Sequence, residues 1–294
     1  PDLQTQLSDC ERVCKAASLH CEMDISMIRE LPVMSRSASS GVFYGRRLIN
    51  LDKGGKAYGA AVDIGTTTIA VYLYDLSNGD CIDIYTELNK QNRFGADVIS
   101  RCEYAARGKG ELDALNEVLI STINRAIEHF TGKINVQDIY HIVFAGNTVM
   151  MHLLLKINPQ YIANAPFIPA FINRITLNAG ELGINLNKAV IDVLPSVAGF
   201  VGADTVAAVI AAGIHESSEI SLLIDIGTNG EMVLGNKEQM ICCSAAAGPA
   251  FEGAHIHNGM RAGDGAIEGV RIEGGGIYCY RRRRAYRNMR FGTS

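Results

Sequence analysis

The sequence predicts an α/β protein built from a duplicated unit, and two observations point to this fold class. Apolar stretches typical of buried strands alternate with stretches typical of amphipathic helices along most of the chain. The same four residues, Asp-Ile-Gly-Thr, occur at 63–66 and again at 225–228, each time at the end of an apolar strand. From Asp63 to Asp225 is a step of 162 residues, which suits a duplicated domain and is far too long for a solenoid repeat.

The expected elements follow one another in the same order in both halves. The first Asp-Ile-Gly-Thr ends a strand that begins near Tyr58, and two further strands are joined by a turn at 77–80. Apolar residues at helical spacing predict a helix over 112–130. The remaining expected elements are a buried strand at 139–146, a helix that Asn147 caps, an alanine-rich helix over 203–216 and a strand at 221–227.

Length and composition allow a large hydrophobic core and do not point to nucleic acid or a membrane as a partner. The chain has 294 residues, of which 48% are hydrophobic, and its formal net charge is -4. That balance gives no electrostatic reason to expect nucleic acid or a membrane surface. No apolar stretch reaches a membrane-spanning length, and the first residues lack the pattern of a signal peptide. We therefore expect a cytoplasmic protein with no nucleic-acid and no membrane partner.

The cysteines and histidines do not predict a metal site. Eight cysteines without a signal peptide are expected to be reduced thiols. Cys10, Cys14 and Cys21 have three and then six residues between them, which fits neither zinc nor ferredoxin spacing, and their role stays open. His152 lies on an apolar helix, where a hydrogen-bonded core histidine is expected.

Asp-Ile-Gly-Thr at the end of a strand suits a nucleotide phosphate. The strand would fix Asp63 at the rim of the sheet, where its carboxylate can hold a hydrated magnesium ion. Gly65 permits a tight turn, and the amides and hydroxyls of Thr66, Thr67 and Thr68 can face phosphate oxygens. The second copy offers the same groups around Asp225, namely Gly227, Thr228, Asn229 and Gly230.

These motifs carry a family resemblance. The stretches around Asp63 and Asp225 resemble the two phosphate motifs of acetate and sugar kinases, heat-shock ATPases and actin, which share a duplicated ribonuclease H-like fold. Further stretches resemble the ATPase domain of reductive activators of corrinoid proteins: 91–105 (QNRFGADVISRCEYA), 144–155 (FAGNTVMMHLLL), 196–213 (SVAGFVGADTVAAVIAAG) and 243–268 (CSAAAGPAFEGAHIHNGMRAGDGAIE). The likeness covers about 58–277, and residues 1–56 resemble more loosely the small domain that precedes this ATPase domain.

The resemblance implies an enzyme that couples ATP hydrolysis to electron transfer onto cob(II)alamin. The expected partner is a corrinoid iron-sulfur protein or a corrinoid methyltransferase protein, and a homodimer is a candidate assembly. An iron-sulfur cluster is expected in the full-length family, but its cysteine pattern is absent from this sequence. The expected domains are 1–56, the preceding domain; 57–215, the first ATPase subdomain; 216–280, the start of the second; and 281–294, an anomalous tail.

The resemblance also assigns roles to individual residues. It implies that Asp63 and Asp225 organise magnesium through water, and that Thr66, Thr67, Thr228 and Asn229 contact phosphates. Asp204 is the candidate for polarising the attacking water, with a simple helix cap as the alternative. Gly248, Phe251 and Glu252 match a stretch that lies near the nucleotide in related activators. Glu252 also suits the first turn of a helix, where the dipole favours a negative charge.

The last fourteen residues differ in composition from the rest of the chain. A basic tail begins at Arg281–Arg284. One interpretation is a patch that binds nucleic acid or a membrane, and another is a solvated segment. A frameshift is the third interpretation. One back-translation of 285–292, read one nucleotide later, gives Pro-Ile-Gly-Ile-Cys-Gly-Ser, which resembles a glycine motif expected here in the family. The second subdomain would then be incomplete, and we expect weak or absent ATP turnover from the isolated chain.

Two other functions remain open at this stage. A small-molecule kinase of the same superfamily would need an acceptor pocket, which no residues in the sequence specify. An actin-like protein would use the nucleotide only for assembly. Fold analogy alone does not separate these functions from the activator.

Overall fold

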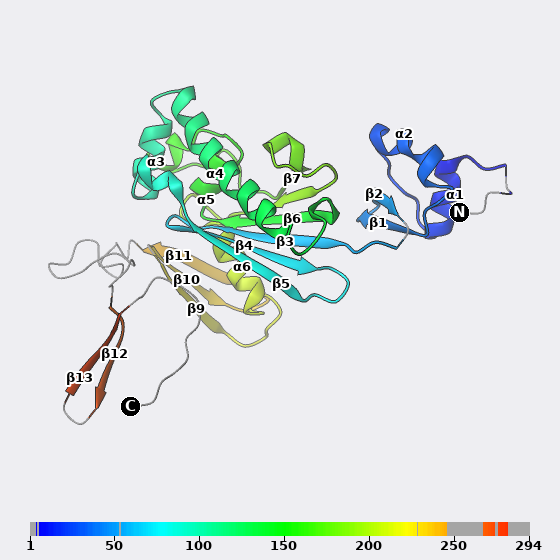
Figure 1. Cartoon of the computed structure of the whole chain (residues 1–294). Coiled ribbons are helices and arrows are strands. Elements are labelled where there is room, and N and C mark those ends of the chain that lie inside the picture. The colour runs from blue at the N-terminus through cyan, green and yellow to red at the C-terminus, as the bar shows by residue number, and fades with distance from the viewer. Residues whose placement is uncertain are drawn as a thin grey trace. The chain divides into compact units, whose positions relative to one another are not determined.

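The computed structural model describes residues 4, 6–52, 54–227, 229–245, 267–273 and 276–281 (Figure 1). The chain divides into two units, Pro1–Glu216 and Ser217–Ser294, each of which has its own sheets. Among the described helices, none combines the length and the apolar character needed to cross a membrane.

The first unit begins with a small N-terminal segment, residues 1–56. It contains two helices and an antiparallel pair of strands: α1 (Asp9–Ala17), α2 (Ile25–Met34), β1 (Ser40–Tyr44) and β2 (Arg47–Asp52). Ser8 caps α1, and the Ser8 and Glu11 side chains form a capping box. The helices and β2 share a small core that includes Val13, Leu31 and Leu48.

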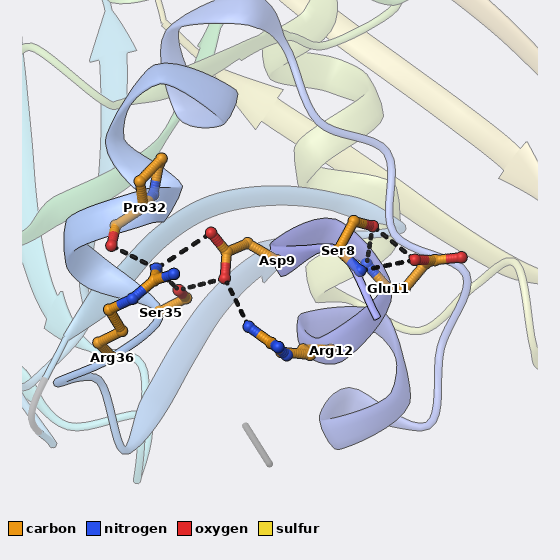
Figure 2. Close-up of polar contacts among 7 residues, drawn as sticks. All are labelled: Ser8, Asp9, Glu11, Arg12, Pro32, Ser35 and Arg36. Atoms are coloured by element: carbon orange, nitrogen blue, oxygen red, sulfur yellow. Dashed lines mark hydrogen bonds and ion pairs between the residues drawn. The ribbon is translucent and has the colours of Figure 1, made fainter. Parts of the chain in front are cut away.

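Asp9 joins the two helices of this segment. Figure 2 shows its carboxylate between the side chains of Arg12, Ser35 and Arg36. The Arg36 guanidinium lies 3.0 Å from the carboxylate and also donates to the carbonyl oxygen of Pro32. The hydrogen bond from Arg36 is the largest of the effects that lower the pKa of Asp9.

A six-stranded mixed sheet forms the body of the first unit, with the order β5-β4-β3-β6-β8-β7. Its strands are β3 (Tyr58–Ile64), β4 (Thr68–Asp75), β5 (Cys81–Leu88), β6 (Ile139–Gly146), β7 (Ile175–Asn178) and β8 (Val190–Val193). The first three form an antiparallel meander, whereas β6 runs parallel to both β3 and β8, and β7 pairs antiparallel with β8. The parallel pairing of β3 with β6 brings their carboxyl ends to one edge of the sheet.

Helices pack against this sheet. They are α3 (Val98–Ala105), α4 (Lys109–Phe130), α5 (Thr148–Leu154) and α6 (Ala203–Ala211), with short 3-10 turns η1 (Lys90–Arg93), η2 (Val136–Asp138), η3 (Gln160–Ile162) and η4 (Ala179–Leu182). Figure 1 shows α3, α4 and α5 together on one face. In one large core, Leu115 and Leu119 of α4 join Val62 and Ile64 of β3.

The predicted helix over 203–216 begins where expected but is shorter. It ends at Ala211, and Gly213 two residues later has a φ of 68°. That left-handed conformation suits glycine at the end of a helix and prevents the helix from continuing.

The second unit repeats the antiparallel meander. Its strands β9 (Ser221–Ile226), β10 (Gly230–Gly235) and β11 (Met240–Ala245) form a sheet in the order β11-β10-β9. A separate hairpin consists of β12 (Ile267–Glu273) and β13 (Gly276–Arg281), which were not among the predicted strands. Residues 282–294, most of the anomalous tail, lie outside the described residues.

One face of the β9–β11 sheet is apolar and exposed. It carries Leu222, Ile224, Ile226, Leu234 and Ile241, each at least 49% exposed. In the first unit, the positions just before and just after the Asp-Ile-Gly-Thr aspartate are buried in the core with α4. No helix among the described residues buries their counterparts, Ile224 and Ile226.

A buried carboxylate ties the N-terminal segment to the large sheet. Asp192 on β8 is 5% exposed and accepts hydrogen bonds from four side chains. Tyr44 of β1 donates through its hydroxyl at 2.7 Å, and Arg174 through Nε at 2.8 Å. Thr176 donates at 2.6 Å, and His141 Nε2 lies 2.8 Å away. Burial alone would raise the pKa of Asp192, but these hydrogen bonds outweigh it and lower the pKa.

We predict that Asp192→Asn lowers the free energy of unfolding at neutral pH by about 2 kcal/mol, because several hydrogen bonds lose a charged acceptor. A lowered folded pKa means that this stabilisation is complete above the ordinary aspartate pKa of about 3.9 and is lost as the pH falls through the folded value. The variant should therefore lose less stability than the wild type as the pH falls below about 4. Urea unfolding followed by circular dichroism measures both effects.

Asp113→Asn is the matched control, because Asp113 forms a more exposed pair with Lys156. Its effect should stay within about 0.5 kcal/mol. Equal effects of the two substitutions would contradict the role given to the Asp192 cluster.

Candidate functional site

The first Asp-Ile-Gly-Thr lies where β3 ends and the chain turns into β4. Asp63 is the second-to-last residue of β3, and its exposed side chain alternates with the buried side chains of Val62 and Ile64. This alternation follows from the strand geometry, in which successive side chains point to opposite faces. The strand therefore presents a carboxylate to solvent at its carboxyl end, as the sequence predicts.

The turn that follows is held from inside the protein through its carbonyl oxygens. The buried side chain of Asn89 donates to the carbonyl of Gly65 at 2.9 Å, and its backbone N–H donates to the carbonyl of Thr67 at 2.8 Å. The carbonyl between them, that of Thr66, accepts from the guanidinium of Arg101 at 2.6 Å. Three consecutive carbonyl oxygens of the loop are thus engaged by the protein.

Gly65 is required by the closeness of the turn. A Cβ atom at this position would lie 2.5 Å from the carbonyl oxygen of Thr68, which belongs to the backbone and cannot swing aside. Thr68 is already the first residue of β4, and its side chain is exposed. The motif therefore has room for glycine alone without a backbone shift.

The start of α6 packs against the carboxyl end of β6, beside the same loop. The Asn147 side chain caps α5 and also donates to the hydroxyl of Thr66 at 3.2 Å. A Cβ on Gly202, the residue before α6, would lie 2.5 Å from the Cα of Asn147. Asp204 is the second residue of α6, and its carboxylate accepts from the backbone N–H of Thr205 at 2.8 Å. The fold thus brings the loop and the start of α6 to one edge of the sheet.

The second Asp-Ile-Gly-Thr occupies the same structural position in the second unit. Asp225 is the second-to-last residue of β9 and is exposed, like Asp63 in β3. The N–H of Gly227 donates to the carbonyl of Asn229 at 3.0 Å, and Gly230 begins β10. The remaining predicted site residues, Thr228, Gly248, Phe251 and Glu252, lie outside the described residues.

Two residues that hold the loop were not predicted from the sequence, and a third was predicted in only part of its role. Asn89 and Arg101 were not singled out, although Arg101 lies in the stretch 91–105 that carries the resemblance. Asn147 was predicted only as a helix cap. The sequence signal for Asn89 is weak, since it is only a polar residue directly after a strand. An arginine on a short helix gives no sequence signal for the role of Arg101.

The described residues contain no group of three or more histidine, cysteine or acidic side chains that could hold a metal ion. Cys10, Cys14 and Cys21 lie around the small N-terminal core, where burial raises the pKa of the Cys21 thiol to about 11. His152 is fully buried, with Nδ1 2.7 Å from the carbonyl of Thr148 and Nε2 accepting from Ala170. The prediction of a hydrogen-bonded core histidine is confirmed.

Comparison with known families identifies the chain. A model of the RACo middle region matches residues 58–217, and a model of the C-terminal domain of RACo, the ASKHA domain, matches residues 219–282. The chain belongs to the RACo family. The ASKHA match confirms the predicted duplicated ribonuclease H-like fold of the actin and heat-shock ATPase type, a fold that uses nucleotides.

Individual relatives agree with this assignment. The corrinoid activation enzyme RamQ of Eubacterium limosum is 40% identical over 240 residues, which are 79% of this chain and 40% of RamQ. A Methanosarcina barkeri reductase of the Co(II) methylated amine-specific corrinoid protein is 30% identical over 227 residues, which are 74% of this chain and 41% of the reductase. A solved reductive activator for a corrinoid, iron-sulfur protein covers 96% of this chain with a TM-score of 0.82 and 35% identity.

The chain spans less than half the length of each of these relatives. It matches 48% of the solved activator.

We predict that Gly65→Ala displaces the loop and lowers the free energy of unfolding of the first unit by about 1–3 kcal/mol, because the added methyl meets backbone. Gly110→Ala is the control, since a Cβ there meets nothing within 4 Å and alanine suits the helix α4. That control should leave stability unchanged or raise it by about 1 kcal/mol. Thermal unfolding of both variants tests the prediction, which is contradicted if Gly65→Ala unfolds with the wild type.

Proposed function

We propose that this chain is the nucleotide-binding part of a reductive activator of corrinoid proteins. Such an activator couples ATP hydrolysis to the transfer of an electron onto cob(II)alamin, which becomes cob(I)alamin. The observation that carries the proposal is the repeated strand and loop, with Asp63 near the end of β3 and Asp225 near the end of β9, in a chain of the RACo family. The names of the relatives, a corrinoid activation enzyme and a corrinoid protein reductase, support the same activity.

The residues at the two strand ends suit a magnesium nucleotide. Mg²⁺ takes one or two carboxylates and keeps several waters, so the exposed carboxylates of Asp63 and Asp225 fit water-mediated binding. The loop has no room for a side chain at Gly65. Without that side chain, a phosphate bound at the loop can approach the backbone N–H groups closely. When bound, the metal would neutralise charge on the phosphates. Thr66, Thr67, Thr228 and Asn229 are the proposed phosphate contacts.

Asp204 is the proposed residue that orients the attacking water. It lies in the first turn of α6, and that end of the helix packs beside Asn147, which contacts Thr66. The carboxylate is half-buried and accepts a hydrogen bond from the backbone N–H of Thr205, which helps to fix its direction. The proposal for the nucleotide further includes Gly248, Phe251 and Glu252, which lie outside the described residues.

The partner would be a corrinoid iron-sulfur protein or a corrinoid methyltransferase protein. Electron transfer to cob(II)alamin is uphill, and a nucleotide can assist it only by binding two states of the complex with different affinity. An iron-sulfur cluster is the electron donor expected of the family. In this proposal the chain supplies the ATP-dependent change of state.

We predict that Asp63→Asn and Asp225→Asn each weaken binding of MgATP by about tenfold or more, because a carboxylate that faces the hydrated metal is lost. In EDTA, where no metal is available, ATP should bind to the variants and to the wild type with similar affinity. Isothermal titration calorimetry measures both. Asp80→Asn, in the exposed turn between β4 and β5, is the control and should bind like the wild type.

No MgATP binding by the wild type would overturn the proposed function itself. Normal binding by both variants would instead overturn only the metal role of the two aspartates.

We predict further that the chain forms a complex with a cob(II)alamin-loaded corrinoid protein and that MgATP changes its affinity. Sedimentation velocity at increasing nucleotide concentration measures this change, and Asp63→Asn should abolish it. A complex that ignores nucleotide would contradict the coupling.

A further inference from the structure

Arg101 is a fully buried arginine directly beneath the loop that follows β3. Its side chain has a relative exposure of 0%, and it lies on α3, whose first turn Asp97 caps. The guanidinium reaches the loop by donating through Nη2 to the carbonyl oxygen of Thr66 at 2.6 Å. No sequence pattern explains why a short helix should bury such a side chain.

Every group that the guanidinium contacts among the described residues is neutral. Besides Thr66, it donates to the carbonyl of Gly95 at 3.0 Å, to the side-chain oxygen of Gln91 at 3.3 Å and to that of Asn92, and it lies 3.4 Å from the sulfur of Met150. These contacts satisfy its N–H groups but do not neutralise its charge.

A buried charge without a hydrogen-bonded carboxylate is costly, and proteins retain one chiefly where it has a use. Burial lowers the pKa of Arg101 to about 10, and the charge of Asp97 partly opposes this effect. The side chain therefore remains a cation at neutral pH. The Asp97 carboxylate accepts from the backbone N–H of Ser100 and does not hydrogen-bond to the guanidinium in any described contact.

The contacts of Arg101 also decide which way the loop faces. An anion is repelled by carbonyl oxygens and attracted by backbone N–H groups. Asn89 engages the carbonyls of Gly65 and Thr67, so the carbonyl of Thr66 is the remaining one that the loop could turn towards a bound phosphate. Arg101 holds that oxygen on the protein side.

We propose that Arg101 is a positioning residue for polyphosphate binding, which keeps the Thr66 carbonyl turned inward and places beneath the loop a positive charge that no carboxylate among the described residues hydrogen-bonds. This inference rests on the proposed nucleotide function of the loop. Arg101 would act through the loop, without touching the ligand.

Two substitutions test the two parts of this role. Arg101→Lys keeps the charge but loses the planar fork that holds Thr66, Asn92 and Gly95 together. Gln91→Glu keeps the fork and places a carboxylate where the guanidinium now meets an amide oxygen, so it neutralises the charge. It also removes the hydrogen bond that the Gln91 amide donates to the carbonyl of Leu115, on the side away from the loop. Arg125→Met is the matched control, because Arg125 is paired with Glu87 on β5 and does not reach the loop in any described contact.

Each of the first two variants should bind the magnesium complex of adenylyl imidodiphosphate about tenfold more weakly, whereas Arg125→Met should bind like the wild type. Calorimetry well below the unfolding temperature of each variant measures the dissociation constants. Arg101→Lys should also speed hydrogen exchange of the loop amides at 65–68 without nucleotide, while Gln91→Glu should not. This exchange measurement needs no ligand and tests the positioning role by itself.

The possible outcomes separate the inference from the proposed function. If the wild type binds the analogue and both variants bind equally well, with lower unfolding temperatures only, Arg101 has a purely structural role and the inference fails. If exchange at 65–68 is unchanged in Arg101→Lys, its positioning role fails. If the wild type does not bind the analogue, the proposed function fails, and the polyphosphate part of the inference fails with it.

Discussion

The tie between the loop after β3 and the protein interior is the constraint on which the proposed site depends. Carbonyl oxygens of Gly65, Thr66 and Thr67 are engaged by Asn89 and Arg101, and Gly65 has no room for a Cβ atom. The loop is therefore fixed before any ligand arrives, which lowers the ordering cost of binding. The parallel pairing of β3 with β6 then brings Asn147 and the start of α6 to this loop.

The duplication visible in the motifs is also a duplication of structure, and the two copies differ in how they are supported. In both, an aspartate precedes the last residue of the first strand of an antiparallel meander. In the first copy, the side chains on either side of the aspartate are buried in a core with α4. In the second copy the corresponding side chains, Ile224 and Ile226, are exposed. The strand before the first loop is therefore supported by a helix-covered core, whereas no helix among the described residues covers the strand before the second.

Much of the fold could be predicted because periodicity and caps are local signals. The strand before Asp63, the helix capped by Asn147 and the turn at 77–80 all follow from neighbouring residues. The network behind the loop could not be predicted, since Arg101 and Asn89 meet the loop only through tertiary packing. The Asp192 cluster is likewise non-local, because it joins Tyr44 to strands more than a hundred residues away. The hairpin β12–β13 was missed because its sequence is rich in glycine and weak in alternation.

The central claim is that the loop after β3, which the protein holds through its carbonyl oxygens, binds the phosphates of a nucleotide. Hydrogen exchange of the amides at 64–67, measured against MgATP concentration, tests it most directly. The account predicts that these amides become protected as MgATP is added and that Asp63→Asn shifts the protection curve to higher MgATP concentration. Exchange that stays unchanged at saturating MgATP would contradict the claim.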